Sequence, residues 1–323
     1  GDINLGSGAL SVTGDVVLAA NVTVTATPSG GTGIVFSDAI NADDASSNDR
    51  TLTLNAGTAS NVFVIGTVGA SQALAGLTVT QSNGIGFFSP VDVTDSNSGT
   101  ITLTDTQDNI LIIFSDVVAD SFVTTTEGYA LRLLGNATFA NAVTFQNTGT
   151  LELGDATSDT FTFNGGVTEN TTGTVTIDGA IVSSNDAISF GNINLGQNLS
   201  VTSAGGAINI GTISAASGSR DISITSSGGS ANTVAVGAIG GSNNINTVAI
   251  TGSTSVTLNG NITTDNSSGN SLTITGTTIN TGAITIDTNN TSNDGAINLV
   301  GSVASSNNNL VLNSGTAEIT LSG

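Results

Sequence analysis

Apolar and hydroxyl-bearing side chains alternate residue by residue along most of the chain. Leu52–Leu54, Val175–Ile177 and Ile319–Leu321 each place a Thr between two aliphatic residues. A period of two puts one set of side chains on a buried face and the other set in water, which is typical of β-strands. Clusters of Gly, Ser and Asn separate these segments and indicate turns. The pattern predicts an all-β protein.

The alternating segments recur at a nearly constant interval. Their first apolar residues include Leu52, Leu77 and Ile101 in the first half, and Ile222, Val248 and Leu272 in the second. Neighbours in each series are 24 to 26 residues apart, and shorter steps of 12 or 13 residues lead from Leu272 to Ile284, Ile297 and Leu310. Repeats of about 20 to 30 residues are the length of a solenoid coil, whereas immunoglobulin-like sandwiches repeat about every 100 residues. We therefore predict a parallel β-helix with roughly 25 residues per coil.

One segment has the spacing of a helix. Ile110, Ile113, Phe114 and Val117 follow one another at intervals of one to three residues. The segment is rich in β-branched residues, which favour strands. We predict strand here as well.

The composition changes near residue 190. All 11 Phe residues and the single Tyr, Tyr129, lie at or before Phe190, as do 19 of the 24 acidic residues. We predict a Phe-containing, more acidic and irregular solenoid region over residues 1–190. Residues 191–323 are predicted to form a slimmer, more regular region rich in Gly, Asn, Ser and Thr, in one continuous rod with the first.

The charge balance excludes several partners. The net charge is −21, and Arg50, Arg132 and Arg220 are the only basic residues. Nucleic-acid binding requires clustered Lys and Arg, so we expect no nucleic-acid partner. The most apolar run, Ile110–Phe114, is far too short to span a bilayer, so we expect no membrane insertion. With no Cys, the chain has neither disulfides nor thiolate metal sites.

Catalytic chemistry lacks its usual residues. Glycoside hydrolysis needs two facing carboxylates, and the nearby acid pairs are Asp43 with Asp44, Asp105 with Asp108, and Asp155 with Asp159. No His or Lys accompanies them, and Arg50 beside Asp43 and Asp49 favours a salt bridge on a turn. A Ser triad fails because there is no His to activate the hydroxyl. We predict no catalytic residue, no enzyme activity and no organic cofactor.

Calcium is the one ligand that the acidic residues suggest. Closely spaced carboxylates suit a hard cation, although neither candidate loop matches an EF-hand or a calcium-binding nonapeptide repeat. The candidate ligands are Asp43, Asp44, Asp49, Asp105 and Asp108.

The phrase Gly-Ala-Ile-x-Ile/Leu recurs at Gly206–Ile210, Gly282–Ile286 and Gly295–Leu299. Together with the segment over residues 52–80, it resembles the repeat regions of filamentous-haemagglutinin-like large exoproteins and autotransporter adhesins. The resemblance extends over essentially the whole chain. It implies a right-handed parallel β-helix that forms a stalk or fibre outside a bacterial cell. The family's secretion domain and outer-membrane barrel have no counterpart in the sequence, so we expect a processed product or an internal piece of a longer protein.

These observations favour an extracellular or cell-surface structural protein, a stalk or self-assembling filament. The strand-like Ile3–Leu5 and Ile319–Leu321 have no polar cap, so we expect head-to-tail stacking with further copies and contacts with neighbouring cell-surface components. One alternative is an adhesin that recognises a glycan or host surface through loops over residues 41–50 and 116–129. Further alternatives are a polysaccharide-active β-helix enzyme and an S-layer lattice protein.

Overall fold

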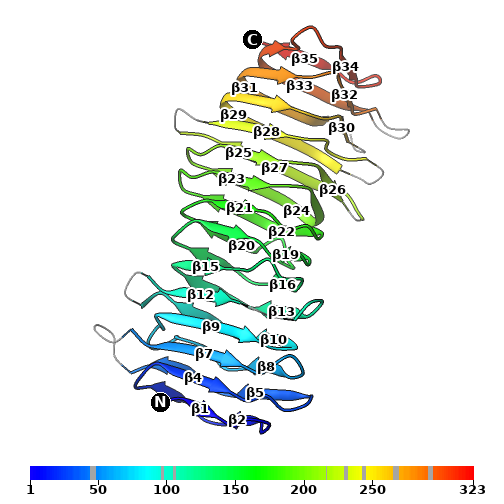
Figure 1. The fold of residues 1–323 in the computed structure, drawn as a ribbon. Coiled ribbons are helices and arrows are strands. Elements are labelled where there is room, and N and C mark those ends of the chain that lie inside the picture. The colour runs from blue at the N-terminus through cyan, green and yellow to red at the C-terminus, as the bar shows by residue number, and fades with distance from the viewer. Residues whose placement is uncertain are drawn as a thin grey trace. The chain divides into compact units, whose positions relative to one another are not determined.

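The computed structural model describes residues 1–43, 49–95, 98–104, 107–215, 217–228, 232–241, 245–264, 269–289 and 294–323. Strands joined by turns make up this part of the chain, and it contains no α-helix. The chain forms two compact units: unit 1 is Gly1–Gly154 with Asn170–Thr174, and unit 2 is Asp155–Glu169 with Val175–Gly323. Each unit is a parallel β-helix (Figure 1), which confirms the predicted fold class. The composition boundary at residue 190 lies within unit 2.

Unit 1 has three strand positions per coil, named A, B and C in their order along the chain. The A strands are β1 (Ile3–Asn4), β4 (Val22–Thr25), β7 (Thr51–Asn55), β9 (Gly76–Gln81), β12 (Thr100–Leu103), β15 (Ser121–Val123) and β18 (Val143–Phe145). The B strands are β2 (Leu10–Val12), β5 (Thr32–Phe36), β8 (Asn61–Val64), β10 (Gly84–Phe87), β13 (Leu111–Phe114), β16 (Ala130–Leu133) and β19 (Leu151–Leu153). The C strands are β3 (Val16–Leu18), β6 (Ile40–Ala42), β11 (Val91–Val93), β14 (Val117–Ala119) and β17 (Ala137–Phe139). Strands at one position pair in parallel from coil to coil, and Val68 alone bridges Ile40 of β6 and Val91 of β11.

Unit 2 follows the same order, but some of its strands continue through two positions. Strands β22 (Val175–Ser183) and β24 (Ile193–Ser203) serve B and then C, whereas β29 (Ile245–Leu258), β31 (Gly269–Thr281) and β33 (Gly295–Ala304) serve C and then A. The other A strands are β21 (Val167–Glu169), β23 (Ile188–Phe190), β25 (Ile208–Ile210) and β28 (Thr233–Val236). The other B strands are β26 (Ile213–Ala215), β30 (Ile262–Thr263), β32 (Ile284–Asp287) and β34 (Leu310–Asn313). The other C strands are β20 (Thr160–Phe163), β27 (Arg220–Ser226) and β35 (Ile319–Ser322).

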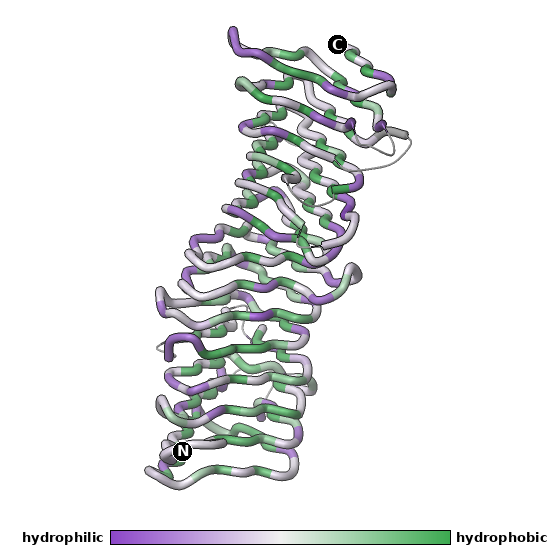
Figure 2. The backbone as a smooth tube through the Cα atoms, turned by 90° about the vertical axis from the view of Figure 1, so that its right-hand side faces the viewer, coloured by the Kyte–Doolittle hydropathy of each residue, from purple (hydrophilic) through white to green (hydrophobic). Residues whose placement is uncertain are grey.

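The register stacks apolar residues on apolar residues through each interior. One row in unit 1 contains Val12, Phe36, Val64, Phe87, Phe114, Leu133 and Leu153. One row in unit 2 contains Leu199, Ile222, Val248, Leu272, Ile297 and Ile319. Figure 2 shows the resulting alternation of hydrophobic and hydrophilic residues along the coils. A single coil cannot bury its inner face, so stacking supplies the core.

The predicted repeat spacing is confirmed in the segments from which it was inferred. Leu52 pairs with Leu77, and Leu77 pairs with Ile101. The coils that follow are shorter, with Ile101 paired with Phe122 and Leu131 paired with Leu151. The shorter steps of 12 and 13 residues have a geometric origin. Leu272 stacks on Ile297 at the C position, whereas Ile284 stacks on Leu310 at the B position. Each short step therefore moves to a different side of a coil.

Local features also follow the sequence. The segment with helix-like spacing forms β13, β14 and β15, so the prediction of strand is confirmed. Asn109 and Asn307 turn corners with φ of 60° and 66°, a left-handed backbone that Asn tolerates better than most residues. Gly206 lies at the corner between β24 and β25, where a Cβ would overlap the backbone of Asp186 in the neighbouring coil.

Candidate functional site

Most of the acidic side chains that the structure places have a structural partner. Nine of them accept a hydrogen bond from a backbone N–H about one coil away: Asp2, Asp15, Asp38, Asp108, Asp116, Asp120, Glu169, Asp178 and Asp294. We call these residues cross-coil acceptors. Backbone ladders break at corners, and a side-chain oxygen there supplies the acceptor that the amide has lost.

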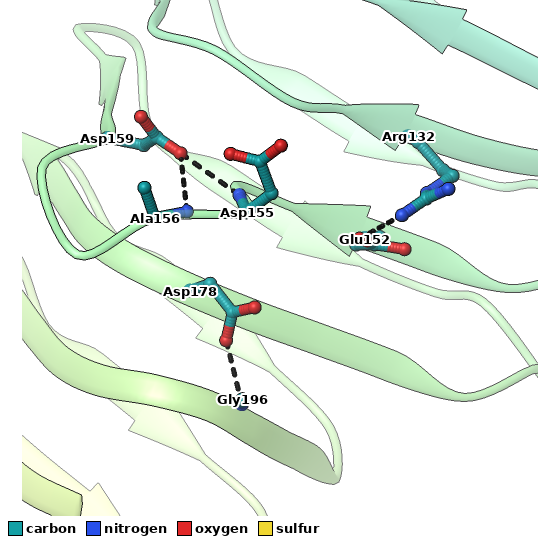
Figure 3. A network of polar contacts seen from close by, with 7 residues as sticks. All are labelled: Arg132, Glu152, Asp155, Ala156, Asp159, Asp178 and Gly196. Atoms are coloured by element: carbon teal, nitrogen blue, oxygen red, sulfur yellow. Dashed lines mark hydrogen bonds and ion pairs between the residues drawn. The ribbon is translucent and has the colours of Figure 1, made fainter.

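Two cross-coil acceptors show the geometry best. The N–H of Gly99 donates to Asp120 Oδ2 at 2.8 Å, and the N–H of Gly196 donates to Asp178 Oδ1 at 2.7 Å (Figure 3). Both Asp side chains are nearly buried, each with 8% of its residue surface exposed. Because a buried amide without an acceptor is costly, these carboxylates stabilise the stacking of coils.

The predicted calcium ligands lie in different surroundings. Arg50 donates to both carboxylate oxygens of Asp43, Nε to Oδ1 at 2.7 Å and Nη2 to Oδ2 at 3.0 Å. The hydrogen bond from Arg50 lowers the pKa of Asp43 below its ordinary value. This ion pair confirms the predicted salt bridge. Asp49 is exposed, and Asp108 Oδ1 accepts from the N–H of Gly128 at 2.9 Å.

Asp44 and Asp105 lie outside the described residues, so one member of each of the first two predicted acid pairs is undescribed. Among the residues that are described, no three acidic side chains gather as metal ligands would. Calcium binding stays a prediction. In the third acid pair, Asp159 Oδ2 accepts from the N–H groups of Asp155 and Ala156 at 3.0 and 2.9 Å (Figure 3). That contact closes a turn.

The predicted binding loop over residues 116–129 is partly strand. It contains β14 and β15, and residues 124–129 after them form a loop. Tyr129, its one large aromatic residue apart from Phe122, is fully buried. Its hydroxyl oxygen accepts from the N–H of Thr125 at 3.0 Å, and burial raises the pKa of the phenol. Periodic β-patterning continues through this segment, so its aromatic residues belong to the core.

An outward-facing apolar cluster was not predicted from the sequence. It lies on the B strands of unit 1, and we call it the outer patch: Val35, Phe63, Ile65, Phe88, Leu111 and Ile113. The register stacks Val35 on Phe63, Phe63 on Gly86, and Gly86 on Ile113. One signal was available in the sequence. In residues 61–65 and 84–88, apolar residues occupy both odd and even positions, so both faces of each strand carry them.

The ring of Phe88 lies across the outer patch. It is 52% exposed, and its centroid is 5.9 Å from that of Phe63 with the planes tilted by 44°. A Cβ on Gly86 would overlap the Phe88 ring, so the ring covers the backbone where Gly leaves room. Gly86 is buried although its position faces outward, and the ring accounts for this.

Unit 2 carries a groove of about 380 Å³ on its C strands. Its floor is a row of small residues: Ala180, Ser200, Ser223 and Ala249. Asp221 in its wall accepts from Asn246 Nδ2 and Thr247 Oγ1, both at 2.7 Å. These bonds connect wall residues of adjacent coils.

The outermost coils of the described chain expose apolar residues that face inward elsewhere. Ile3 and Leu5 are 38% and 40% exposed, and Ile319 and Leu321 are 40% and 61% exposed. One coil further in, Leu299 is fully buried. A hollow of about 330 Å³ beside β1 is lined mainly by aliphatic side chains of the first coils.

No family model, curated protein or solved structure matches this chain. The resemblance to filamentous-haemagglutinin-like repeats therefore stays a prediction from the alternation, the repeated phrase and residues 52–80. In the part of the chain that is described, no helix is long and apolar enough to cross a membrane.

Proposed function

We propose that the chain is an extracellular structural protein, a stalk or filament that extends by stacking β-solenoid coils of successive copies. The observation that supports this most strongly is the register, which places apolar residues on apolar residues where one coil covers the next. These rows are buried between coils. Because burial of apolar surface favours association, coils of successive copies would stack through the same contacts.

The two outermost coils are complementary, position by position. The last coil presents Val303 at A, Leu310 and Leu312 at B, and Ile319 and Leu321 at C. The first coil presents Ile3 at A, Leu10 and Val12 at B, and Val16 and Leu18 at C. Stacking one copy on the next would therefore place aliphatic rows on aliphatic rows at all three positions. Such a heterologous contact leaves a free surface at each end and continues without closing.

Composition supports an extracellular location. The chain has no Cys, and its coils are tied by hydrogen bonds from the backbone to carboxylate and amide oxygens. The net charge of −21 keeps the surface soluble and disfavours non-specific contacts. The resemblance to exoprotein repeats points the same way. In this proposal the chain has no catalytic role.

Sedimentation velocity over a range of concentrations tests the proposal. The 323-residue chain is expected to form end-to-end oligomers that grow with concentration. Leu321→Asp places a charge in the proposed interface and is expected to shift the chain to monomer. Val311→Asp is the matched control, because Val311 is 50% exposed and faces outward between Leu310 and Leu312. A chain that stays monomeric at every concentration, or equal effects of the two variants, would contradict the proposal.

A further inference from the structure

The outer patch of unit 1 is not required by the fold. Outward positions on the B strands of unit 2 carry polar residues such as Thr176, Asn194, Ser214 and Thr285. Those strands stack in the same parallel register without any outward aromatic residue. An exposed apolar cluster that packing does not need is the usual mark of a binding surface.

We propose that the outer patch binds a short stretch of a neutral polysaccharide. The patch lies on the outer face of a parallel sheet, and its centre is the ring of Phe88 beside the ring of Phe63. The face of an aromatic ring carries negative charge density, so it attracts the polarised C–H bonds of a sugar ring laid on it. Gly86, which has no side chain, leaves room for the Phe88 ring against the strand.

Polar groups stand at the edge of the patch where a sugar hydroxyl would reach. Asn83 Nδ2 donates to Asn61 Oδ1 at 3.3 Å on one side, and both residues precede the aromatic positions on their own coils. On another side, Ser89 follows Phe88 and donates from Oγ to the carbonyl of Ile65 at 2.6 Å. Amide and hydroxyl groups of this kind fix orientation while the rings supply contact area.

The size of the patch favours a sugar over a protein partner. Four coils about 4.8 Å apart and three outward positions per strand give an area on the order of 300 Å². A stable protein interface needs roughly 800 Å² from each partner. A di- or trisaccharide, in contrast, fits a surface of this size.

The charge of the protein surface favours a neutral sugar as the ligand of the outer patch. Arg132 is the one basic residue beside the patch, stacked on Ile113, and its Nη2 lies 2.6 Å from Glu152 Oε1 (Figure 3). Its charge is thus balanced by Glu152, and the net charge of the chain is −21. Sulfated or sialylated sugars would be repelled by this surface.

The test is binding of the 323-residue chain to an array of neutral hexose and N-acetylhexosamine oligosaccharides, together with sulfated and sialylated counterparts. Neutral members are expected to bind, and titration calorimetry should show an affinity loss of about tenfold or more for Phe88→Ala and for Phe63→Ala. Gly86→Ala, which displaces the Phe88 ring without removing it, should weaken binding as well. Val311→Ala removes an equally exposed residue from a B strand of unit 2 and should leave binding unchanged.

Circular dichroism of each variant confirms that the fold is retained. No binding by any neutral oligosaccharide would overturn the proposal. So would binding that survives Phe88→Ala and Phe63→Ala, or binding restricted to charged sugars. A change of oligomeric state in Phe88→Ala would instead identify a second copy as the occupant. None of these outcomes depends on whether the coils polymerise end to end.

Discussion

Units 1 and 2 use one stacking rule with different side chains. The interior of unit 1 holds stacked rings, with Phe87 and Phe114 at 4.7 Å and nearly parallel, and its strands are two to six residues long. No aromatic residue follows Phe190 in the sequence, so the buried hydrophobic residues of unit 2 beyond it are aliphatic, and strands such as β29 run for 14 residues through a corner. This stacking requires mainly that the inward positions of the strands carry apolar residues. Packing constrains the residues of the outer rows less than those of the inner rows.

The largest expected effect comes from exchanging the interiors. Phe114→Ala should cost about 3–5 kcal/mol, because it empties the space between Phe87 and Phe122. Ile274→Phe in unit 2 should cost about 1–3 kcal/mol, because Ile250 and Leu299 leave no room for a ring. Urea unfolding measures both, and fluorescence of Tyr129 reports on unit 1 alone. If an aromatic ring in the core changed the free energy of unfolding equally in both units, the two interiors would not differ in this respect.

The cross-coil acceptors should contribute a smaller amount in either unit. Asp178→Ala leaves the N–H of Gly196 without its acceptor and should lower the free energy of unfolding by about 1–3 kcal/mol. Asp178→Asn keeps an oxygen in place and should retain most of the stability. Chemical denaturation of the two variants side by side makes the comparison. If Ala and Asn prove equally harmful, the charge rather than the hydrogen bond is what matters.

Removing the outer patch should barely change stability. Phe88→Ser takes away a half-exposed ring that the core does not use, so the change should stay within about 0.5 kcal/mol. The expected Tm therefore matches that of the unsubstituted chain and of Val311→Ser in unit 2. A loss as large as that of Phe114→Ala would show that the patch belongs to the packing of unit 1.

The smallest expected effect is on the acid dependence of unit 2. Hydrogen bonds from the Oγ1 and N–H of Thr316, at 2.7 and 2.6 Å, lower the pKa of Asp294 below the ordinary value of 3.8. A lowered folded-state pKa means that the stabilisation is complete above 3.8 and is lost as the pH falls through the folded value. Asp294→Asn should flatten this part of the stability profile between about pH 5 and pH 2. An unchanged profile would mean that other carboxylates account for all of it.

The sequence was sufficient for the repeating part of the fold. Alternation such as Leu52-Thr53-Leu54 identifies the inward residues, and in the regular coils the repeat interval identifies the residue that stacks on each, as Leu77 does on Leu52. The sequence did not predict the hydrogen bonds at the corners. For example, no pattern in the sequence indicates that Asp178 accepts from the N–H of Gly196 in the next coil. It also missed the outer patch, since Phe63 looks like a core residue until the strand register shows which way it faces. The predicted binding loop over residues 116–129 ends at Tyr129, whose burial the sequence did not indicate.

X-ray fibre diffraction and electron microscopy of the concentrated 323-residue chain test the central proposal most directly. End-to-end stacking predicts unbranched filaments with a repeat of about 4.8 Å along the filament axis, the spacing of successive coils. It also predicts that Leu321→Asp yields no filaments under the same conditions. Discrete particles of the unsubstituted chain at every concentration, or filaments whose 4.8 Å repeat runs across the axis, would contradict it.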